Sequence, residues 1–191
     1  MMRYIFAGIV VLAAAALGYW SFQWYRGSDG EPYGAPFTLL DQRGAEITQA
    51  AFRGHPSAVF FGFTHCPEIC PTTLFEMDGW LKALGPEGAD IRGYFVTVDP
   101  ARDTPEVLDA YVGNVSDRIT GITGSPEDVA AMAKSFGIFM RKVELEDGDY
   151  TMDHTASVLL LDATGDFFGT IAYGENPETA LAKLKRLASG S

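Results

Sequence analysis

The sequence predicts an α/β domain built on a mixed sheet, and three observations support this expectation. Residues 57–63 (SAVFFGF) form a nearly unbroken apolar run of strand length, as in a central strand covered on both faces. A helical pattern over residues 72–84 and a second apolar strand over residues 91–98 follow, an order that implies a right-handed parallel crossover. Later short apolar runs, separated by Asp/Gly turns, indicate antiparallel strands.

The remaining elements follow from local signals. Residues 36–44 (PFTLLDQRG) have the pattern of a small strand and a turn. Three helices are predicted where a capping residue precedes proline, at Thr104-Pro105, Ser125-Pro126 and Asn176-Pro177, the last helix running to residue 188. Strands are expected over residues 139–145, 157–161 and 167–172, linked by EDGD and ATGD turns. This order fits a thioredoxin-like fold with insertions, which by itself assigns no function.

The first 26 residues have the pattern of a membrane anchor. Residues 4–22 carry no charge and are about as long as a bilayer-spanning helix. Arg3 precedes this stretch and aromatic residues cluster at its far end, which favours an uncleaved helix with its amino end in the cytoplasm. A cleaved signal peptide is the alternative, because alanines 13–16 offer small residues to a protease. We therefore expect an anchor (1–26), a tether (27–35) and an exported domain (36–191) on the periplasmic side of an inner membrane.

Charge and length restrict the classes of partner. The 191 residues suffice for one domain with a core and a short appendage, and 47% of them are hydrophobic. After residue 26 the chain has 12 basic and 25 acidic residues, a net charge of −13. This charge argues against nucleic acid and anionic lipid headgroups as partners of the exported domain.

The two cysteines, Cys66 and Cys70, lie in FGFTHCPEICP, directly after the predicted central strand. In open α/β sheets, sites form at this end of the strands. If the segment is helical, the two side chains share one face, and the helix amino terminus favours the thiolate form. A disulfide across four residues is sterically allowed but stabilises little, so a switchable pair is expected. An inert disulfide or two buried thiols remain the alternatives.

Three histidines are candidates to join the cysteines. Two thiolates and one imidazole would favour Cu(I) and can also hold Cu(II). His55 lies in a Gly-His-Pro turn and is expected to be exposed, and His65 adjoins Cys66 but is expected to point elsewhere. His154 precedes an apolar strand, where a buried histidine without function is the ordinary expectation. Met152 would share its face in an extended segment, more as a core or hairpin residue than as a soft ligand.

Four segments, in order and spacing, resemble the SCO/SenC proteins, the copper chaperones of cytochrome oxidase assembly. They are FGFTHCPEICPTTL, FVTVDPARDTPEVLDAY, ITGITGSPEDV and MDHTASVLLLD, and the resemblance covers residues 36–187. It implies that Cys66, Cys70 and His154 bind copper and that the copper-bearing subunit of cytochrome c oxidase is the partner. The family more often has Asp where this chain has Glu68, which keeps the charge and lengthens the side chain.

Asp99, Arg102 and Asp103 follow the second parallel strand and should lie at the same sheet edge as the cysteines. An ion pair that shapes the loop and a helix cap are the ordinary expectation. The alternative is that these residues tune or dock the site.

The resemblance implies a metallochaperone that passes copper to the dinuclear copper (CuA) centre of cytochrome c oxidase by stepwise exchange of thiolate ligands, and nothing in composition or spacing by itself names an oxidase. The main alternative is a thiol-disulfide oxidoreductase in which Cys66 and Cys70 are a redox-active disulfide and His154 has no role. A thiol peroxidase fits less well, since it needs one specially activated cysteine. A copper-responsive sensor is also compatible. Other periplasmic copper chaperones or thiol-disulfide reductases are further expected partners.

Overall fold

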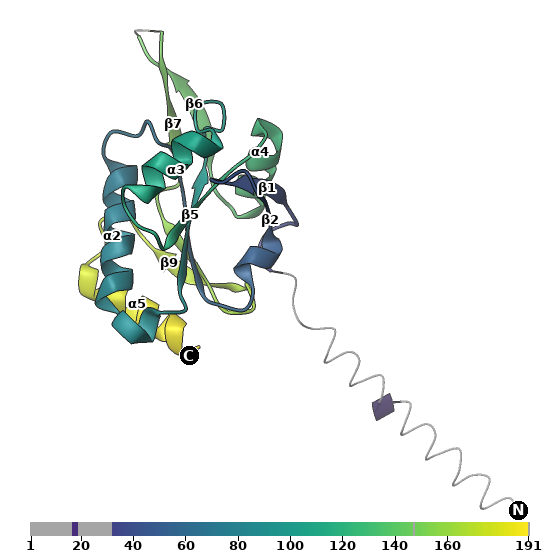
Figure 1. Cartoon of the computed structure of the whole chain (residues 1–191), viewed down its shortest axis with the longest axis vertical. Helices are drawn as coiled ribbons and strands as arrows, with labels where there is room; N and C mark the ends of the chain where they lie inside the picture. The colour runs from purple at the N-terminus through teal and green to yellow at the C-terminus, as the bar shows by residue number, and fades with distance from the viewer. Residues whose placement is uncertain (1–16, 19–31, 147, 191) are drawn as a thin grey trace, which may run out of the picture. The chain divides into compact units, whose positions relative to one another are not determined.

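In the computed structural model, which describes residues 17–18, 32–146 and 148–190, the chain from Pro32 is organised around a seven-stranded mixed sheet (Figure 1). The strand order is β2-β1-β5-β4-β3-β8-β9. The strands are β1 (Thr38–Asp41), β2 (Glu46–Thr48), β3 (Ser57–Gly62), β4 (Arg92–Thr97), β5 (Ile119–Thr123), β8 (Val158–Leu161) and β9 (Phe167–Ile171). β3, β4 and β5 are parallel and the other pairings are antiparallel, so the predicted mixed sheet is confirmed.

Strand β3 is the predicted central strand and is buried along its whole length. It pairs with β4 in parallel, from Ser57 opposite Arg92 to Gly62 opposite Thr97. Because the two strands end level, the residues that follow them meet at one edge of the sheet. This register positions the cysteine segment beside residues 98–103.

Four helices are described from residue 32 onward: α2 (Ile69–Ala83), α3 (Pro105–Gly113), α4 (Pro126–Ser135) and α5 (Pro177–Ser189). Two short 3-10 turns, η1 (Gln49–Phe52) and η2 (Gly85–Gly88), complete the elements. The side-chain oxygens of Thr104, Ser125 and Asn176 each accept a hydrogen bond from a first-turn N–H, and proline follows each of them. The three helix starts that were predicted from a capping residue followed by proline are therefore confirmed.

The predicted start of the helix after the cysteines is wrong. Helix α2 begins at Ile69 rather than at residue 72. Cys66 lies before the helix in a turn, in which the backbone N–H of Cys66 donates to the Phe63 carbonyl at 3.3 Å. Cys66 and Cys70 thus do not share a helix face. Pro67 explains why Cys66 is not helical, because a residue that precedes proline is disfavoured in the α region.

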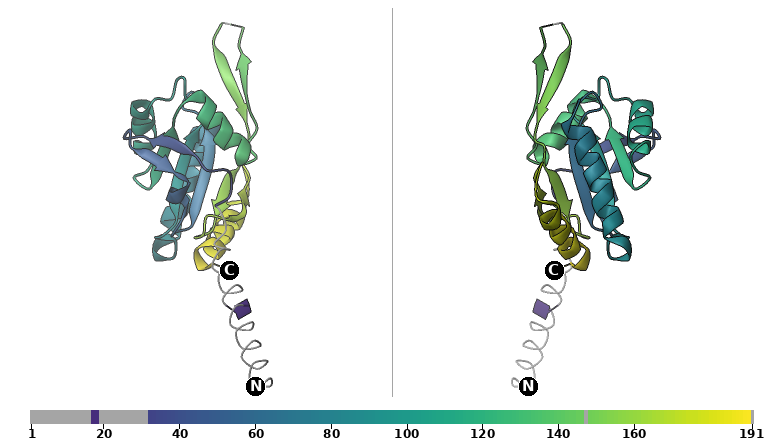
Figure 2. Two further views of the ribbon diagram at one scale, coloured as in Figure 1. Left: turned by 90° about the vertical axis from the view of Figure 1, so that its right-hand side faces the viewer. Right: turned by 90° about the vertical axis from the view of Figure 1, so that its left-hand side faces the viewer.

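Strands β6 (Met140–Glu144) and β7 (Tyr150–His154) form a separate hairpin that projects from the rest of the domain (Figures 1 and 2). The sequence predicted the first of these strands but missed β7, whose residues are polar and at most half-buried. It also missed β2 and β5. In β5 (ITGIT) a glycine interrupts an already short run, and glycine is depleted in strands.

The expected anchor, residues 1–26, lies outside the described residues except for Leu17 and Gly18, which are helical. Residues 27–31 of the expected tether are also outside the described part. Among the residues that the structure describes, no helix combines the length and the apolar character needed to cross a bilayer.

Candidate metal centre

The two cysteines differ in exposure. Cys70 lies in the first turn of α2 and is fully buried, whereas Cys66 is half-buried in the preceding turn. The backbone N–H of Cys70 donates to the Sγ atom of Cys66 at 3.4 Å. The amino end of the helix therefore points one of its unpaired donors at the first sulfur, as a thiolate requires.

The two thiols also differ in acidity. A hydrogen bond from the Cys70 thiol, together with His154 and the backbone N–H groups of Cys70 and Glu68, lowers the pKa of Cys66 to about 3 even though burial acts to raise it. The same hydrogen bond, together with burial, raises the pKa of Cys70 far above its ordinary value. The pair therefore consists of a half-exposed thiolate and a buried thiol.

His154 ends strand β7 and reaches the buried cysteine. Its Nε2 atom lies 3.6 Å from the Sγ atom of Cys70, and its Nδ1 atom lies 3.0 Å from the Thr155 carbonyl oxygen. Because a carbonyl oxygen only accepts hydrogen bonds, Nδ1 donates to Thr155, and Nε2 is the ring nitrogen that faces the sulfur. The ring packs edge-on against Phe60 and Phe63, which fixes its plane.

A cavity of about 310 Å³ opens between the cysteine turn and the hairpin, and Cys66 and His154 line it from opposite elements. Met152 lines the same cavity and packs against the core, as expected for a hairpin residue. Glu68 also lines it and is otherwise exposed. An ion in this cavity would face the sulfur of Cys66 and the imidazole of His154, whose Nε2 atom also lies 3.6 Å from the sulfur of Cys70.

The other two histidines lie away from these contacts. His65 is exposed, and its Nδ1 atom lies 3.1 Å from the hydroxyl of Thr64. The prediction that His55 is exposed is wrong, since only 8% of its surface is accessible. It stacks on Tyr94 and contacts Ser57 at the opposite end of β3 from the cysteines. The Gly-His-Pro turn folds the ring inward because an aromatic neighbour lies on the adjacent strand β4.

Within residues 32–146 and 148–190, no group of three or more His, Cys, Asp and Glu side chains is arranged to hold a metal ion as it stands. The structure does bring the three expected ligands together: Cys70 contacts His154, and Cys66 contacts Cys70. Two thiols and an imidazole fit a soft ion such as Cu(I). A bound ion would require the side chains of this cluster to close around it.

Asp99, Arg102 and Asp103 lie at the sheet edge predicted for them. Asp99 and Arg102 form an ion pair, and the Asp103 carboxylate accepts hydrogen bonds from Thr64. Asp103 does not cap α3, because that role belongs to Thr104.

Two residues near the site were not predicted from the sequence: Thr64, and Tyr150, which contacts both Asp99 and Arg102. The position of Thr64, two residues before Cys66, could have indicated that it belongs to the site. No sequence pattern indicated Tyr150, because its strand was not predicted.

Together, the fold and the site define a thioredoxin-like dithiol protein in which a hairpin histidine lies beside the buried cysteine. The chain belongs to the SCO1/SenC family, whose model matches residues 26–189. It is 33% identical over 159 residues to the SCO2-like protein of Rickettsia felis, covering 82% of this chain and 78% of the relative. Other members are longer, and this chain spans 42% of a mitochondrial SCO1 homologue of Arabidopsis thaliana.

Solved structures agree with this assignment. Bradyrhizobium japonicum ScoI, solved with copper bound, is 41% identical, with a TM-score of 0.74 and coverage of 81% of this chain and 98% of that one. BsSco, described as having a disulfide switch and as a member of the Sco family of cytochrome c oxidase assembly proteins, is 26% identical. Its TM-score is 0.65, over 84% of this chain and 98% of that one. Sco proteins therefore take part in oxidase assembly and include copper-bound members.

Proposed function

We propose that this chain is a copper metallochaperone. Cys66, Cys70 and His154 bind one copper ion, and the chain delivers it to the CuA centre in the copper-bearing subunit of cytochrome c oxidase. The observation that carries the proposal is the 3.6 Å contact between His154 Nε2 and Cys70 Sγ. Exchange of thiols and disulfides has no need of this imidazole, whereas a copper site made of two thiolates gains its third ligand from it.

The unequal exposure of the cysteines suits a transfer by ligand exchange. Cys66 is half-exposed at the cavity, so a thiolate of the acceptor can replace it on the ion first. Cys70 and His154 hold the ion from the inner side until further acceptor ligands arrive. Copper need never be released into solution during such a sequence.

The cellular setting is part of the proposal. Residues 1–26 would anchor the chain in the inner membrane with the domain in the periplasm, near an oxidase subunit and other copper chaperones or thiol-disulfide reductases. The anchor is supported by the uncharged stretch over residues 4–22. Amino-terminal sequencing of the mature protein tests it, because a chain that begins after alanines 13–16 would carry a cleaved signal peptide instead.

A specific observation favours a second candidate function, the reduction of a disulfide in the target. Cys66 is a half-exposed thiolate and Cys70 a buried thiol. The Cys66 thiolate would attack one sulfur of the target disulfide and release the other as a thiolate. Cys70, giving up its proton, would then attack Cys66 and release the second target thiol. Two electrons pass to the target, and this chain is left with a Cys66–Cys70 disulfide.

One pair of variants separates the two functions. In the reduced full-length chain, His154→Ala should lower Cu(I) affinity about tenfold or more, while reduction of a model disulfide changes by about threefold or less. His65→Ala is the matched control, since this exposed histidine adjoins Cys66 but does not face Cys70.

A complementation experiment tests the same distinction in cells. In cells that lack the native protein, His154→Ala should fail to restore oxidase activity at limiting copper. Full activity of this variant would favour the reductase.

A further inference from the structure

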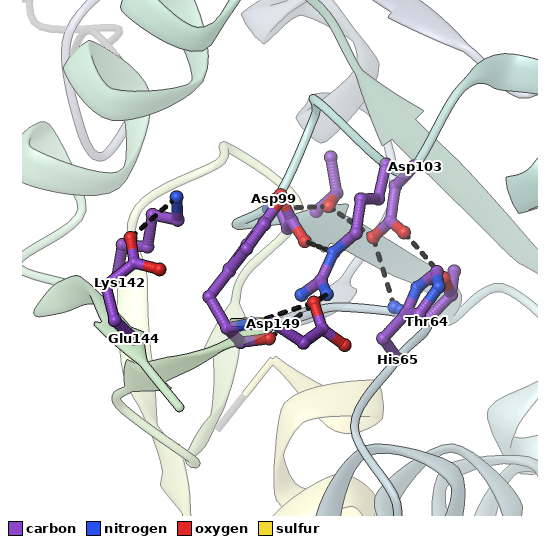
Figure 3. Close-up of polar contacts among 10 residues, drawn as sticks. Thr64, His65, Asp99, Asp103, Lys142, Glu144 and Asp149 are labelled. Atoms are coloured by element: carbon purple, nitrogen blue, oxygen red, sulfur yellow. Dashed lines mark hydrogen bonds and ion pairs between the residues drawn. The ribbon is translucent and has the colours of Figure 1, made fainter. Parts of the chain in front are cut away.

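The loop of residues 99–103, here called the bridging loop, contacts both halves of the candidate copper site. It follows β4 and ends where α3 begins. One end bonds to the turn that carries Cys66, and the other end bonds to the hairpin that carries His154 (Figure 3). The cysteines and the histidine are therefore linked through a third segment.

On the cysteine side, the link is the fully buried carboxylate of Asp103. Its Oδ2 atom accepts hydrogen bonds from the backbone N–H of Thr64 at 3.1 Å and the hydroxyl of Thr97 at 2.6 Å. Its Oδ1 atom accepts from the hydroxyl of Thr64 at 2.6 Å. Thr64 lies two residues before Cys66, so Asp103 fixes the start of the cysteine turn to the end of β4.

On the hairpin side, the link is Tyr150. Its hydroxyl donates to Asp99 Oδ1 at 2.9 Å, and the guanidinium carbon of Arg102 lies 3.7 Å from the centre of its ring. Arg102 Nη1 also donates to the Tyr150 carbonyl at 3.1 Å and to Asp149 at 3.3 Å. Arg102 is in turn held by its ion pair with Asp99. One tyrosine thus joins the hairpin to two residues of the bridging loop.

The two residues of the bridging loop that Tyr150 contacts are buried or mostly buried. The side chain of Asp99 is 4% exposed and that of Arg102 16% exposed, so their interactions with Tyr150 are little screened by solvent. Two ion pairs within the hairpin are open to solvent: in Arg141–Asp153 the side chains are 64% and 48% exposed, and in Lys142–Glu144 they are 51% and 68% exposed. Exposed pairs contribute little.

The register of β7 connects Tyr150 to the imidazole. Side chains alternate along a strand, so Tyr150, Met152 and His154 lie on one face. Fixing Tyr150 against the bridging loop therefore turns the face that carries His154 toward the cysteines. A projecting two-stranded ribbon has little stability of its own, so a contact four residues from the imidazole can decide where the ring lies.

We infer that Asp99, Arg102 and Tyr150 are positioning residues that hold His154 against Cys70 before copper arrives and thereby set the copper affinity. This inference rests on the proposed function, in which His154 is a copper ligand. The residues act through His154 and do not touch the ion. Preorganisation of this kind raises affinity because less ordering remains to be done when the ion binds.

The test is a double-mutant cycle in the reduced full-length chain, with Cu(I) affinity measured by competition with a chromogenic chelator. Tyr150→Leu removes both the ring stack and the hydroxyl and should lower the affinity about tenfold. Tyr150→Phe keeps the stack and should lose about threefold. In the His154→Ala background, either change should alter the affinity less than about twofold. Glu144→Gln breaks the exposed ion pair with Lys142, which itself packs on the Tyr150 ring, but leaves the contacts of Tyr150 with Asp99 and Arg102; it is the matched control and should leave the affinity unchanged.

A second measurement reports the position of the ring without copper. In the copper-free chain, the ¹⁵N resonances of the His154 imidazole should shift in Tyr150→Leu and remain in place in Glu144→Gln, with thermal unfolding confirming that each variant is folded. Equal loss of affinity in both backgrounds, or unchanged imidazole resonances in Tyr150→Leu, would overturn the inference. If His154→Ala alone leaves the affinity unchanged, the proposed function fails, and the resonances still decide whether Tyr150 positions the ring.

Discussion

The Nε2 atom of His154 lies 3.6 Å from the Sγ atom of Cys70, although 84 residues separate them in the chain. Cys70 comes from helix α2 and His154 from the end of the hairpin, so the contact exists only when both are packed at the same edge of the sheet. The chemistry expected of the site therefore depends on the redox state of the cysteines and on the integrity of the fold around them.

Copper binding should depend on reduced cysteines. The reduced full-length chain is expected to bind one copper ion, and the chain oxidised to a Cys66–Cys70 disulfide should bind none, because a disulfide offers no thiolate. Metal analysis after gel filtration measures the stoichiometry, and reductant should restore it. Undiminished copper in the oxidised chain, or in a Cys66→Ser and Cys70→Ser double variant, would place the ion elsewhere.

Alkylation should modify Cys66 selectively and at low pH. With a pKa of about 3, Cys66 remains a thiolate well below neutrality, so its rate with iodoacetamide should stay nearly constant from about pH 8 to pH 5. An ordinary thiol would slow about tenfold per pH unit over this range. Cys70→Ala removes the thiol donor and should restore part of that pH dependence. Mass spectrometry identifies the modified residue, and equal labelling of buried Cys70 in the folded wild-type chain would contradict the geometry.

Removing the Asp103 carboxylate should destabilise the domain. Asp103→Ala leaves the Thr64 N–H and the Thr97 hydroxyl without their buried acceptor, at a cost of about 3 kcal/mol in the free energy of unfolding. Asp109→Ala, an exposed change on α3, should cost about 0.5 kcal/mol or less. Urea denaturation measures both values. Equal effects of the two substitutions would show that the Asp103 contacts contribute little.

Burial of His55 should make the domain less stable in mild acid. Burial lowers the pKa of His55 below its ordinary value near 6.5, so the unfolded chain takes up a proton more readily than the folded one. The stability that the neutral ring provides is complete above about pH 6.5 and decreases as the pH falls below it, by at most about 1.4 kcal/mol per pH unit. Urea denaturation between pH 7.5 and 5.5 should show a shallower decline in His55→Gln than in the wild type. His65→Gln should retain the wild-type slope, and an unchanged slope in His55→Gln would assign the effect to other groups.

Much of the fold followed from local sequence. The apolar run of β3, the β4 strand and the three capped helices were predictable because each depends on residues within a few positions of one another. Strands β2, β5 and β7 were not, because their short, polar or glycine-containing segments are stabilised by partners distant in the chain. The burial of His55 was also missed, since its neighbour Tyr94 lies on another strand.

The sequence by itself determined that two cysteines follow a buried strand at the amino end of a helix, and the family resemblance added His154 as their companion. The tertiary structure decided what no local pattern contains: that Cys66 lies before the helix, that Cys70 is buried against the imidazole, and that Tyr150 joins the hairpin to the bridging loop. The physical reason is that local sequence sets backbone preferences over a few residues. Contacts across tens of residues depend on strand pairing and packing, which only the folded chain specifies.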